Sequence, residues 1–456
     1  MMIDSFIEKR LPTLHCTPVK NAHFDTALKL RACTEQRDWV EENFQLLDFI
    51  SKRIEISRCL YDSYLASGGR ATTQRLAPEW QALALLLLLK DFLRLQASGD
   101  NINAIKRLNA ILKLHDHLQP DKNALEDELK AFIAKAADEF LRDFQPTEPD
   151  ANESKSAEPD SHATKTIPLT VLFWEGPIAR AYLATLSSMG LQPEKIIQLI
   201  SKNDLSSKKP VGRFLPGIMR MAYADSRQKS SIHYWSTTLQ KTETALHGCM
   251  RTVIERDFNI SKDVVDDALE LKHLNSYSPN VEQLLVDGLA DEHLHRYLQK
   301  LPETRILFTG GGIVPKKLLE LDHLKFIHVH PGYLPEVRGA DCALWSQLVK
   351  GCTSATCFYM APGIDDGDVI VSAYLPALHF DLEKPVTDLK SLYRATYAFF
   401  DPWIRASVLR RTIAMTSGFA EVNATEQIEE GSVTYHFMHE RIQQAVFSRL
   451  FSPFAR

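Results

Sequence analysis

The stretch IPLTVLFWEGPIARAYLATLSSMGLQPEKIIQLI, residues 167–200, decides the fold class. It begins with an apolar, β-branched run that ends in Glu-Gly, continues with the helix-like segment PIARAYLATLSSMGL, and closes with a second apolar run, EKIIQLI. Two strands that are connected through a helix lie parallel in one sheet. The stretch therefore predicts a β-α-β unit, and with it an α/β domain.

The same alternation continues towards the C-terminus. RILFTGGGIVPKKLLELDHL, residues 305–324, predicts a strand, a tight glycine turn and a helix, and FIHVH, residues 326–330, predicts the next strand. SATCFYM and DVIVSAYLPALHF add further short strands. Between residues 201 and 300 the pattern is weaker, and SIHYWSTTLQKTETALHGCMRTVIERDF and DEHLHRYLQKL favour helices.

Residues 1–144 predict an all-α domain whose role the sequence does not identify. In APEWQALALLLLLKDFLRLQ, Pro78 stands near a first helical turn and strong helix formers follow it. NALEDELKAFIAKAADEFLRDF spaces its apolar residues by three and four. Residues 145–166 are rich in Pro, Ser, Glu and Asp, which predicts a flexible linker. Residues 167–400 then make the α/β domain, and residues 401–456 a helical and short-strand appendage.

Composition restricts the function classes. Of the 456 residues, 45% are hydrophobic and 24% are charged, as in an ordinary globular protein. The net charge of −5 and the pI near 6.4 argue against an extended nucleic-acid surface, although a local basic patch is compatible with both values. Seven scattered cysteines without a CxxC pair indicate neither a disulfide framework nor a zinc knuckle. Because we find neither a signal peptide nor a membrane-spanning run, we expect a cytoplasmic protein without a membrane partner.

The stretch HVHPGYLPEVRG, residues 328–339, ends a strand with two histidines. Residues two apart in a strand point to the same face, so His328 and His330 are expected to be neighbours. Three interpretations compete: a metal site, a catalytic site, and histidines that are satisfied by hydrogen bonds at a strand end. Metal enzymes with HxH on a strand need most of a barrel of about 250 residues. Since only 126 residues follow His330, we expect no metal.

Two loops accompany the histidines. APGIDDGDVIV, residues 361–371, places acids in a glycine-flanked loop; a carboxylate there could orient an imidazole, or the loop could be a simple Asp-Gly turn. TGGGIVP, residues 309–315, lets the backbone pass close to a ligand at the carboxyl ends of the strands. It is neither GxGxxG nor a Walker P-loop, so a nucleotide phosphate is poorly supported. A tight turn without a ligand is the alternative for this glycine run.

HVHPGYLPEVRGADCALWSQLVKGCTSATCFYMAPGIDDGDVI, residues 328–370, resembles the signature of the folate-dependent formyltransferases, which include methionyl-tRNA, glycinamide ribonucleotide and sugar N-formyltransferases. The elements that match in order and spacing are His330-Pro331, Leu334-Pro335, Arg338-Gly339, Gly351 and Asp365–Ile370. The resemblance covers about 167–400, densely only from 305 to 370. It implies a Rossmann-like, mostly parallel sheet, and residues 1–144 have no counterpart in it.

The resemblance also implies an activity and a set of site residues. A formyl group would move from 10-formyltetrahydrofolate to an amine, with His330 as the catalytic histidine and Asp365 as the carboxylate that positions it and helps proton transfer. The residues implied for the cofactor wall are Gly311, Gly312, Ile313, Val314, Gly363 and Ile364. The acceptor-side candidates are Tyr333, Arg338 and Trp345, each of which is equally open to a structural role.

His328 departs from the family pattern, which has Asn at this position. The reaction needs a donor aimed at the oxygen that becomes negative as the amine attacks. A neutral imidazole supplies one N–H and an imidazolium a stronger one, so His328 can fill the role with a steeper pH dependence. The alternatives are a drift to another acceptor and a loss of catalysis.

The charge of the C-terminal part bears on the acceptor. The 86 residues after Ile370 hold nine Lys/Arg and nine Asp/Glu, so their charges balance. A segment without excess positive charge is expected to bind tRNA poorly. We therefore expect no nucleic-acid partner and a small amine as acceptor, such as an amino sugar nucleotide or another biosynthetic amine. Two alternatives stay open: a 10-formyltetrahydrofolate hydrolase, and a weakened folate-binding protein that serves as a scaffold. The N-terminal helical domain offers a surface for oligomerisation.

Overall fold

The computed structural model describes residues 78–118, 127–149, 164–310, 312–382, 388–428 and 430–452. The chain divides into two compact units. One contains the chain up to Gln145 together with His436–Ala445, and the other contains Pro146–Tyr435 and the chain from Val446 onward. The boundaries expected at residues 144, 166 and 400 stay predictions. Among the described residues, no helix combines the length and the apolar character that crossing a membrane requires.

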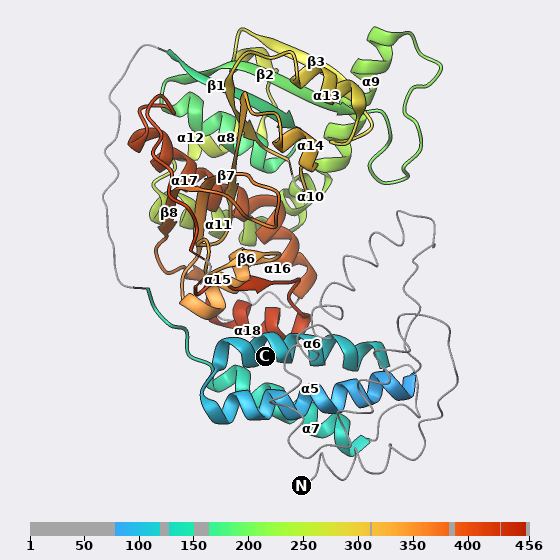
Figure 1. Cartoon of the computed structure of the whole chain (residues 1–456), viewed down its shortest axis with the longest axis vertical. Coiled ribbons are helices and arrows are strands. Elements are labelled where there is room, and N and C mark those ends of the chain that lie inside the picture. The colour runs from blue at the N-terminus through green and yellow to red at the C-terminus, as the bar shows by residue number, and fades with distance from the viewer. Residues whose placement is uncertain are drawn as a thin grey trace. The chain divides into compact units, whose positions relative to one another are not determined.

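The helical unit is built on α5 (Pro78–Ser98), α6 (Asn101–Leu118) and α7 (Asp127–Asp143), which are drawn in blue to teal in Figure 1. Gly99 has a φ of +77° and ends α5 in the left-handed conformation. The carboxylate of Asp100 then accepts a hydrogen bond from the backbone N–H of Asn103 (3.1 Å) and caps α6. A buried ion pair between Asp91 and Arg107 (2.8 Å) joins the two helices. The helical character predicted for this part of the chain is confirmed for the described residues.

The segment His436–Ala445 completes the helical unit from the far end of the chain. The backbone N–H of His439 donates to the side-chain oxygen of Asn109 (2.8 Å), and its ring pairs with Asp116 (2.8 Å). Arg441 pairs with Asp138 (2.8 Å). These contacts lie 303 to 330 residues apart in sequence, which is why local patterns did not assign this segment to the helical unit.

The second unit holds a seven-stranded sheet in the order β3-β2-β1-β4-β5-β7-β8. Its strands are β1 (Lys165–Trp174), β2 (Leu191–Ser201), β3 (Val281–Val286), β4 (Thr304–Phe308), β5 (Leu324–His330), β7 (Ser354–Tyr359) and β8 (Val369–Tyr374). Two two-stranded pairs join β6 (Arg338–Gly339) to β10 (Thr434–Tyr435), and β9 (Phe380–Asp381) to β11 (Phe451–Ser452).

The helices of this unit connect the strands. They are α8 (Pro177–Ser188), α9 (Gly217–Ile232), α10 (Tyr234–Thr242), α11 (Thr244–Phe258), α12 (Lys262–Leu269), α13 (Glu292–Leu298), α14 (Lys316–Leu319), α15 (Cys342–Lys350), α16 (Leu389–Ala395) and α17 (Asp401–Met415). The last helix, α18 (Glu440–Leu450), begins in the helical unit and ends in this one. A 3-10 turn, η2 (Leu274–Ser276), and a π-helical turn, η3 (Thr396–Phe400), complete the set.

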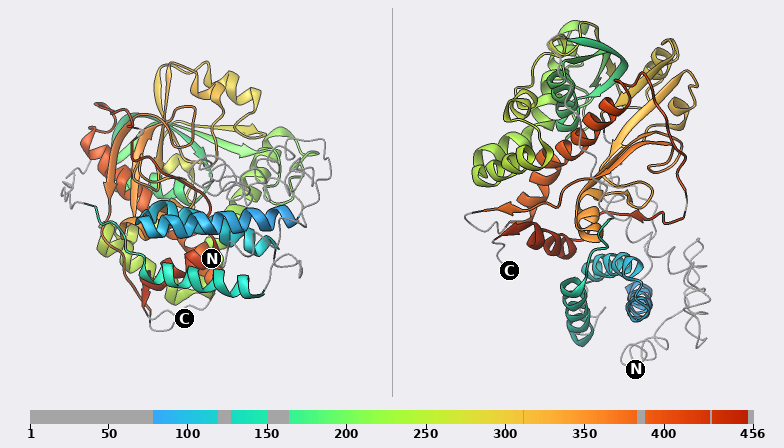
Figure 2. Two further views of the ribbon diagram at one scale, coloured as in Figure 1. Left: turned by 60° about the horizontal axis from the view of Figure 1, so that its bottom comes forward. Right: turned by 90° about the vertical axis from the view of Figure 1, so that its left-hand side faces the viewer.

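The sheet confirms the predicted α/β class. Strands β3, β2, β1, β4 and β5 are parallel, and β7 and β8 add antiparallel pairs at one end. β3 was not predicted: VEQLLV carries Glu and Gln, and only two of its six residues are buried because it lies at the sheet edge. Helix α17 packs with α8 on one face and runs along the sheet in the right-hand view of Figure 2. On the other face, α13 and α14 close an apolar core that includes Leu172, Phe308 and Phe326.

Candidate active site

The sheet reverses its winding direction between two neighbouring strands. From β1 the chain proceeds outward through β2 to β3, and it then returns to place β4 and β5 on the other side of β1. In open α/β sheets, ligands bind outside the carboxyl ends of the strands at such a switch point. The carboxyl ends nearest to it are Trp174, Phe308 and His330. The predicted histidines therefore stand at the edge where the topology favours a binding site.

His330 is brought together with Asp365, as the sequence predicted. The ring is 3% exposed. Its Nε2 lies 3.0 Å from the carbonyl oxygen of Val337, and because a carbonyl only accepts, Nε2–H is the donor. Its Nδ1 lies 3.3 Å from Oδ1 of Asp365. The two side chains can therefore hold a proton between Nδ1 and the carboxylate.

The loop around Asp365 is shaped to present its carboxylate. Asp365 has a φ of +52°, in the left-handed region that a non-glycine residue rarely adopts. Its Oδ2 accepts a hydrogen bond from the backbone N–H of Gly339 (2.8 Å). Burial alone would raise the pKa of this carboxyl, but the charge and hydrogen bond of His330, together with the Gly339 N–H, outweigh it and lower the pKa to about 2. The carboxylate is therefore ionised at neutral pH.

Two glycines of the HVHPGYLPEVRG stretch leave no space for a side chain. A Cβ on Gly332 would lie 2.2 Å from the carbonyl oxygen of Val337 and 2.7 Å from Nε2 of His330. A Cβ on Gly339, whose φ is +104°, would lie 2.0 Å from the carbonyl oxygen of Tyr435. The Pro-Gly and Arg-Gly pairs thus allow the backbone to pack directly against the ring of His330 and against β10.

Sequence reasoning missed the C-terminal residues that support this loop. β10 pairs with β6, so the backbone of Tyr435 backs Gly339. The side-chain amide of Gln427 donates to the carbonyl oxygens of Asp365 (3.1 Å) and Gly367 (2.7 Å). Its oxygen accepts a hydrogen bond from Arg338 (2.8 Å). No local motif marks Gln427, because its role depends on a fold contact across about 60 residues.

His328 lies on the same face of β5, between the rings of Phe308 and Phe358. Its Nδ1 lies 3.3 Å from the carbonyl oxygen of Phe308 and must donate to it. Burial first, and the charge of Arg405 second, lower the pKa of His328 to about 4. The ring is therefore neutral at pH 7, and its remaining nitrogen, Nε2, offers a lone pair. In this arrangement His328 would donate an N–H from Nε2 only as an imidazolium, which its lowered pKa disfavours.

Arg405 of α17 reaches the strand that carries both histidines, and sequence reasoning did not single it out. Its Nη1 donates to the carbonyl oxygen of Val329 (2.8 Å), the residue between His328 and His330. Its Nε donates to Asp401 (2.8 Å), whose side chain is 2% exposed. Burial acts to lower the pKa of Arg405, but Asp401 outweighs it and the pKa is raised. A permanent positive charge therefore lies beneath the end of β5.

The residues expected to form a cofactor wall are placed differently from one another. Gly311 lies outside the described residues. Gly312 has a φ of +99° with open space around it, and Ile313 is 81% exposed. Gly363 and Ile364 are exposed beside Asp365. Val314 is the exception, because its side chain is buried in the sheet core with Phe308 and Leu318, and only its backbone is available to a ligand.

The three acceptor-side candidates also differ from one another in exposure and in contacts. Tyr333 is partly buried and stacks on Tyr374, with ring centroids 4.2 Å apart. Arg338 is largely buried and holds Gln427. Trp345 has no exposed surface and stacks on Tyr435, so its side chain serves packing and we do not carry it into the proposed site. Tyr333 is the one of the three with exposed side-chain surface and no role in the Asp365 loop.

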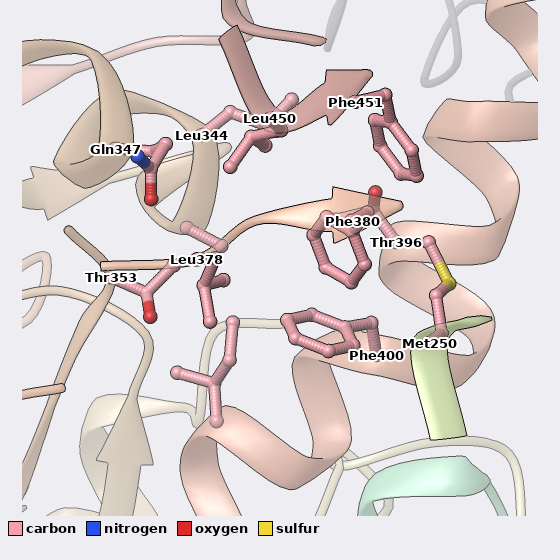
Figure 3. A pocket seen from close by; sticks show the side chains of 12 residues that line it. Met250, Leu344, Gln347, Thr353, Leu378, Phe380, Thr396, Phe400, Leu450 and Phe451 are labelled. Carbon is pink, nitrogen blue, oxygen red and sulfur yellow. The ribbon is translucent and has the colours of Figure 1, made fainter. Parts of the chain in front are cut away.

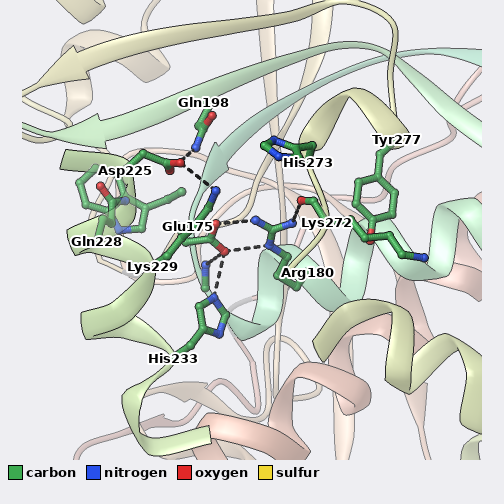
Figure 4. Close-up of polar contacts among 12 residues, drawn as sticks. Glu175, Arg180, Gln198, Asp225, Gln228, Lys229, His233, Lys272, His273 and Tyr277 are labelled. Atoms are coloured by element: carbon green, nitrogen blue, oxygen red, sulfur yellow. Dashed lines mark hydrogen bonds and ion pairs between the residues drawn. The ribbon is translucent and has the colours of Figure 1, made fainter. Parts of the chain in front are cut away.

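A buried ion cluster, drawn in Figure 4, closes the carboxyl end of β1. The carboxylate of Glu175 accepts from Arg180 (2.9 and 2.6 Å) and lies 3.0 Å from Nε2 of His233, at the junction of α9 and α10. Arg180 also donates to the carbonyl oxygen of Lys272 (2.6 Å). Burial would raise the pKa of Glu175, but His233 and Arg180 lower it to about 2. The cluster fixes the β1–α8 turn beside the switch point.

Neither the apolar hollow nor the arrangement of potential metal ligands provides a second site among the described residues. The apolar hollow in Figure 3 has a volume of about 20 Å³ and is lined by residues of α11, α15, α17 and β9, such as Met250, Leu344 and Phe380. That volume admits about one water molecule, and none of the predicted site residues lines it. Among the described residues, no group of three or more His, Cys, Asp or Glu side chains is arranged to hold a metal ion.

Comparisons with known proteins match the part of the chain that contains these residues. The family model described as formyl transferase matches residues 260–391, a segment that contains both histidines and Asp365. The methionyl-tRNA formyltransferase of Syntrophus aciditrophicus is 35% identical over 92 residues, which are 20% of this chain and 29% of that protein. The methionyl-tRNA formyltransferase of Syntrophomonas wolfei is 27% identical over 161 residues, 33% and 50% of the two chains. The chain thus spans half or less of the length of these relatives.

Solved structures are similar at a lower level. A sugar N-formyltransferase from Shewanella has 12% identity and a TM-score of 0.32, with 61% of this chain and 87% of that chain covered. The formyltransferase PseJ of Anoxybacillus kamchatkensis has 18% identity and a TM-score of 0.25, with 36% and 77% covered. TM-scores this low carry no functional argument. What the comparisons show is a match between the formyl transferase family model and residues 260–391, the segment that contains the His330–Asp365 pair.

Proposed function

We propose that the protein transfers the formyl group of 10-formyltetrahydrofolate to the amine of a small biosynthetic acceptor. The observation that carries the proposal is the pairing of His330 with Asp365 (3.3 Å) at the carboxyl end of β5, inside the segment that matches the formyl transferase family. An ionised carboxylate beside a buried imidazole is suited to moving a proton during acyl transfer.

In the proposed reaction the amine nitrogen attacks the formyl carbon, and the bond between that carbon and N10 of the donor breaks. The amine loses one proton and N10 gains one, so the proton must be held and passed on at the site. His330 and Asp365 hold it at Nδ1. The folate donor would lie against the exposed segments that contain Gly312, Ile313 and Ile364.

His328 has a different proposed part from the one expected of the family's Asn. Because its Nδ1–H is used by the carbonyl oxygen of Phe308, its neutral ring offers Nε2 as an acceptor. An acceptor there can orient the N–H groups of the attacking amine. Stabilisation of the developing oxyanion would then rest on other donors.

Proton-transfer partners in such sites contribute about 10²- to 10⁴-fold to the rate. The experiment is a mass-spectrometric assay for formylated product with 10-formyltetrahydrofolate, comparing wild type, His330→Ala and Asp365→Asn. Asp366→Asn on the same loop is the matched control, since among the described residues its carboxylate accepts a hydrogen bond only from the neighbouring Gly367 N–H (3.0 Å). Loss of product in the first two variants and not in the control supports the proposal. Equal turnover in all four proteins contradicts it.

The acceptor is tested in the same assay by three parallel reactions, with a panel of amino sugar nucleotides, with methionyl-tRNA, and with no amine. A formylated sugar nucleotide supports the proposed acceptor class. A formylated methionyl-tRNA would replace that class with the substrate named for the curated relatives. Formate release without any amine would replace the transferase with a hydrolase. Stoichiometric binding of the 5-formyl analogue without turnover in any reaction would assign a folate-binding scaffold.

A further inference from the structure

The loop before α9 and the first turn of that helix expose apolar side chains to an unusual degree. Phe214 is 96% exposed, Ile218 89% and Met219 58%. Leu215 lies among them and is also exposed. Scattered apolar residues on a surface need no explanation, but four within six positions make a local apolar patch of the kind that marks an interaction site.

The same segment is strongly cationic. Between residues 205 and 224 the chain has Lys208, Lys209, Arg213 and Arg220, and it has no Asp or Glu, although the whole chain carries a net charge of −5. The acids that flank the segment are neutralised by other cations, since Asp204 pairs with Arg227 and Asp225 pairs with Lys229. α9 also begins without a side-chain cap or an acidic residue in its first turn, so the positive end of its dipole adds to the charge.

The segment is held firmly at its base. Val211 and Ala224 are buried against Ile200 at the end of β2. Gly212 has a φ of +57°, and the side chains of Leu215, Arg220 and Tyr223 surround it at 3.2 to 3.3 Å from where a Cβ would stand. In Figure 1 the loop extends away from the sheet beside α9. The apolar side chains are therefore presented by a fixed scaffold.

We propose that this cationic-apolar surface, residues 208–223, docks the protein on an anionic lipid bilayer. Aliphatic and aromatic side chains on an amphipathic element enter the interface between headgroups and acyl chains, while Lys and Arg meet the anionic headgroups. Nucleic acid is the weaker occupant, because single-stranded bases stack on aromatic side chains and three of the five exposed large hydrophobic residues of this surface, Leu215, Ile218 and Met219, are aliphatic.

The position of the surface gives the docking a consequence. It follows the carboxyl end of β2, the same edge of the sheet at which β5 ends in His330. β2 and β5 are three strand spacings apart, roughly 14 Å at about 4.8 Å per strand. Docking therefore brings the candidate active-site edge close to the bilayer surface. The expectation of no membrane partner followed from the lack of a long apolar run, a signal that a short surface patch does not produce.

The test is co-sedimentation of the full chain with vesicles of phosphatidylglycerol and phosphatidylcholine, and with vesicles of phosphatidylcholine alone. Phe214→Ser/Ile218→Ser removes the apolar contacts, and Lys208→Gln/Lys209→Gln/Arg213→Gln removes the charge. The matched control is Met415→Ser/Ile428→Ser, a pair that is 63% and 71% exposed elsewhere on the same unit. We expect wild type and control to bind the anionic vesicles, and each surface variant to bind at least tenfold more weakly.

Salt supplies a further readout, because raising the salt from about 0.1 M to about 1 M shortens the Debye length from about 10 Å to about 3 Å. It should release wild type from the vesicles. Wild type that stays in the supernatant, or a control that loses binding equally, overturns the proposal. If the protein binds no vesicles but binds RNA, or forms a dimer in light scattering, and if either result depends on Phe214 and Ile218, the proposal is also overturned. None of these readouts uses formyl transfer, so the docking and the proposed function fail separately.

Discussion

Replacing Asp365 by Asn removes one charge from the centre of the candidate site and little else. The amide can still accept a hydrogen bond from the Gly339 N–H, which lies 2.8 Å from Oδ2. What is lost is the interaction with His330, 3.3 Å away. The perturbation therefore isolates the charge of the carboxylate from its shape.

The magnitude follows from the pKa of Asp365, which is lowered from 3.8 to about 2. At about 1.36 kcal/mol per pKa unit, that difference corresponds to about 2 kcal/mol of folding stability. Because the pKa is lower in the folded protein than in the unfolded chain, this stability is fully present above about pH 4. It is lost as the pH falls through about 2. Asp365→Asn should therefore be less stable than wild type at pH 7.

The assay is thermal unfolding at pH 7, with Asp366→Asn as the control on the same loop. The unit that holds the site has about 300 residues, so at about 2.1 cal/mol/K of unfolding entropy per residue a loss of about 2 kcal/mol lowers the Tm by roughly 3 °C. The control should lie close to wild type. An Asp365→Asn variant as stable as Asp366→Asn would refute the charge pairing. So would a stability difference from wild type that did not begin to shrink below pH 4.

Three further predictions concern the support of the site. The ring of His328 should titrate at about 4 in an NMR pH series, and a ring that titrates near 6.5 contradicts its burial. Because the unfolded chain binds this proton near 6.5, protonation of His328 should lower the stability of the folded protein progressively as the pH falls from 6.5 to 4. Arg405→Met should lower the free energy of unfolding in urea by about 3 to 5 kcal/mol, because it leaves Asp401 buried without its ion pair. Adding Asp401→Asn should recover part of that loss, and equal stability of the single and double variants would exclude the pairing. Gly339→Ala should be far more destabilising than Gly312→Ala in the same measurement. Both glycines have a positive φ, but only at Gly339 would the added Cβ lie 2.0 Å from a backbone carbonyl oxygen. Similar unfolding midpoints for the two variants would contradict this.

Local sequence patterns predicted most of the strands of the sheet. The apolar runs that end at Trp174, Ile200, Phe308 and His330 all became strands, because each is buried on both faces and β-branched or aromatic residues suit such positions. β3 was missed because an edge strand pairs on one side only and tolerates Glu and Gln. Residues 311 and 1–77 lie outside the described residues, so the expectations placed on them stay open.

The candidate site was predictable only in part. The spacing of HVHPG and IDDGDV was enough to pair His330 with Asp365, since matched motifs in register reflect one common fold. Val314 and Trp345 proved to be buried, and a short motif does not state which of its side chains face the core. Gln427 and Arg405 could not be found, because each acts through backbone carbonyls that are far away in sequence.

By itself, the sequence determined the α/β class, the strand that ends in the two histidines and the pairing of His330 with Asp365, because periodicity and motif spacing are local properties of the chain. Only the tertiary structure decided the state of that chemistry. The neutral ring of His328, the ionised carboxylate of Asp365 and the charge of Arg405 beneath them all depend on burial and on partners that are distant in sequence, such as Arg405, which is 76 residues from Val329. The strength of such interactions depends on the distance and exposure that folding creates, and neither is written in the order of the residues.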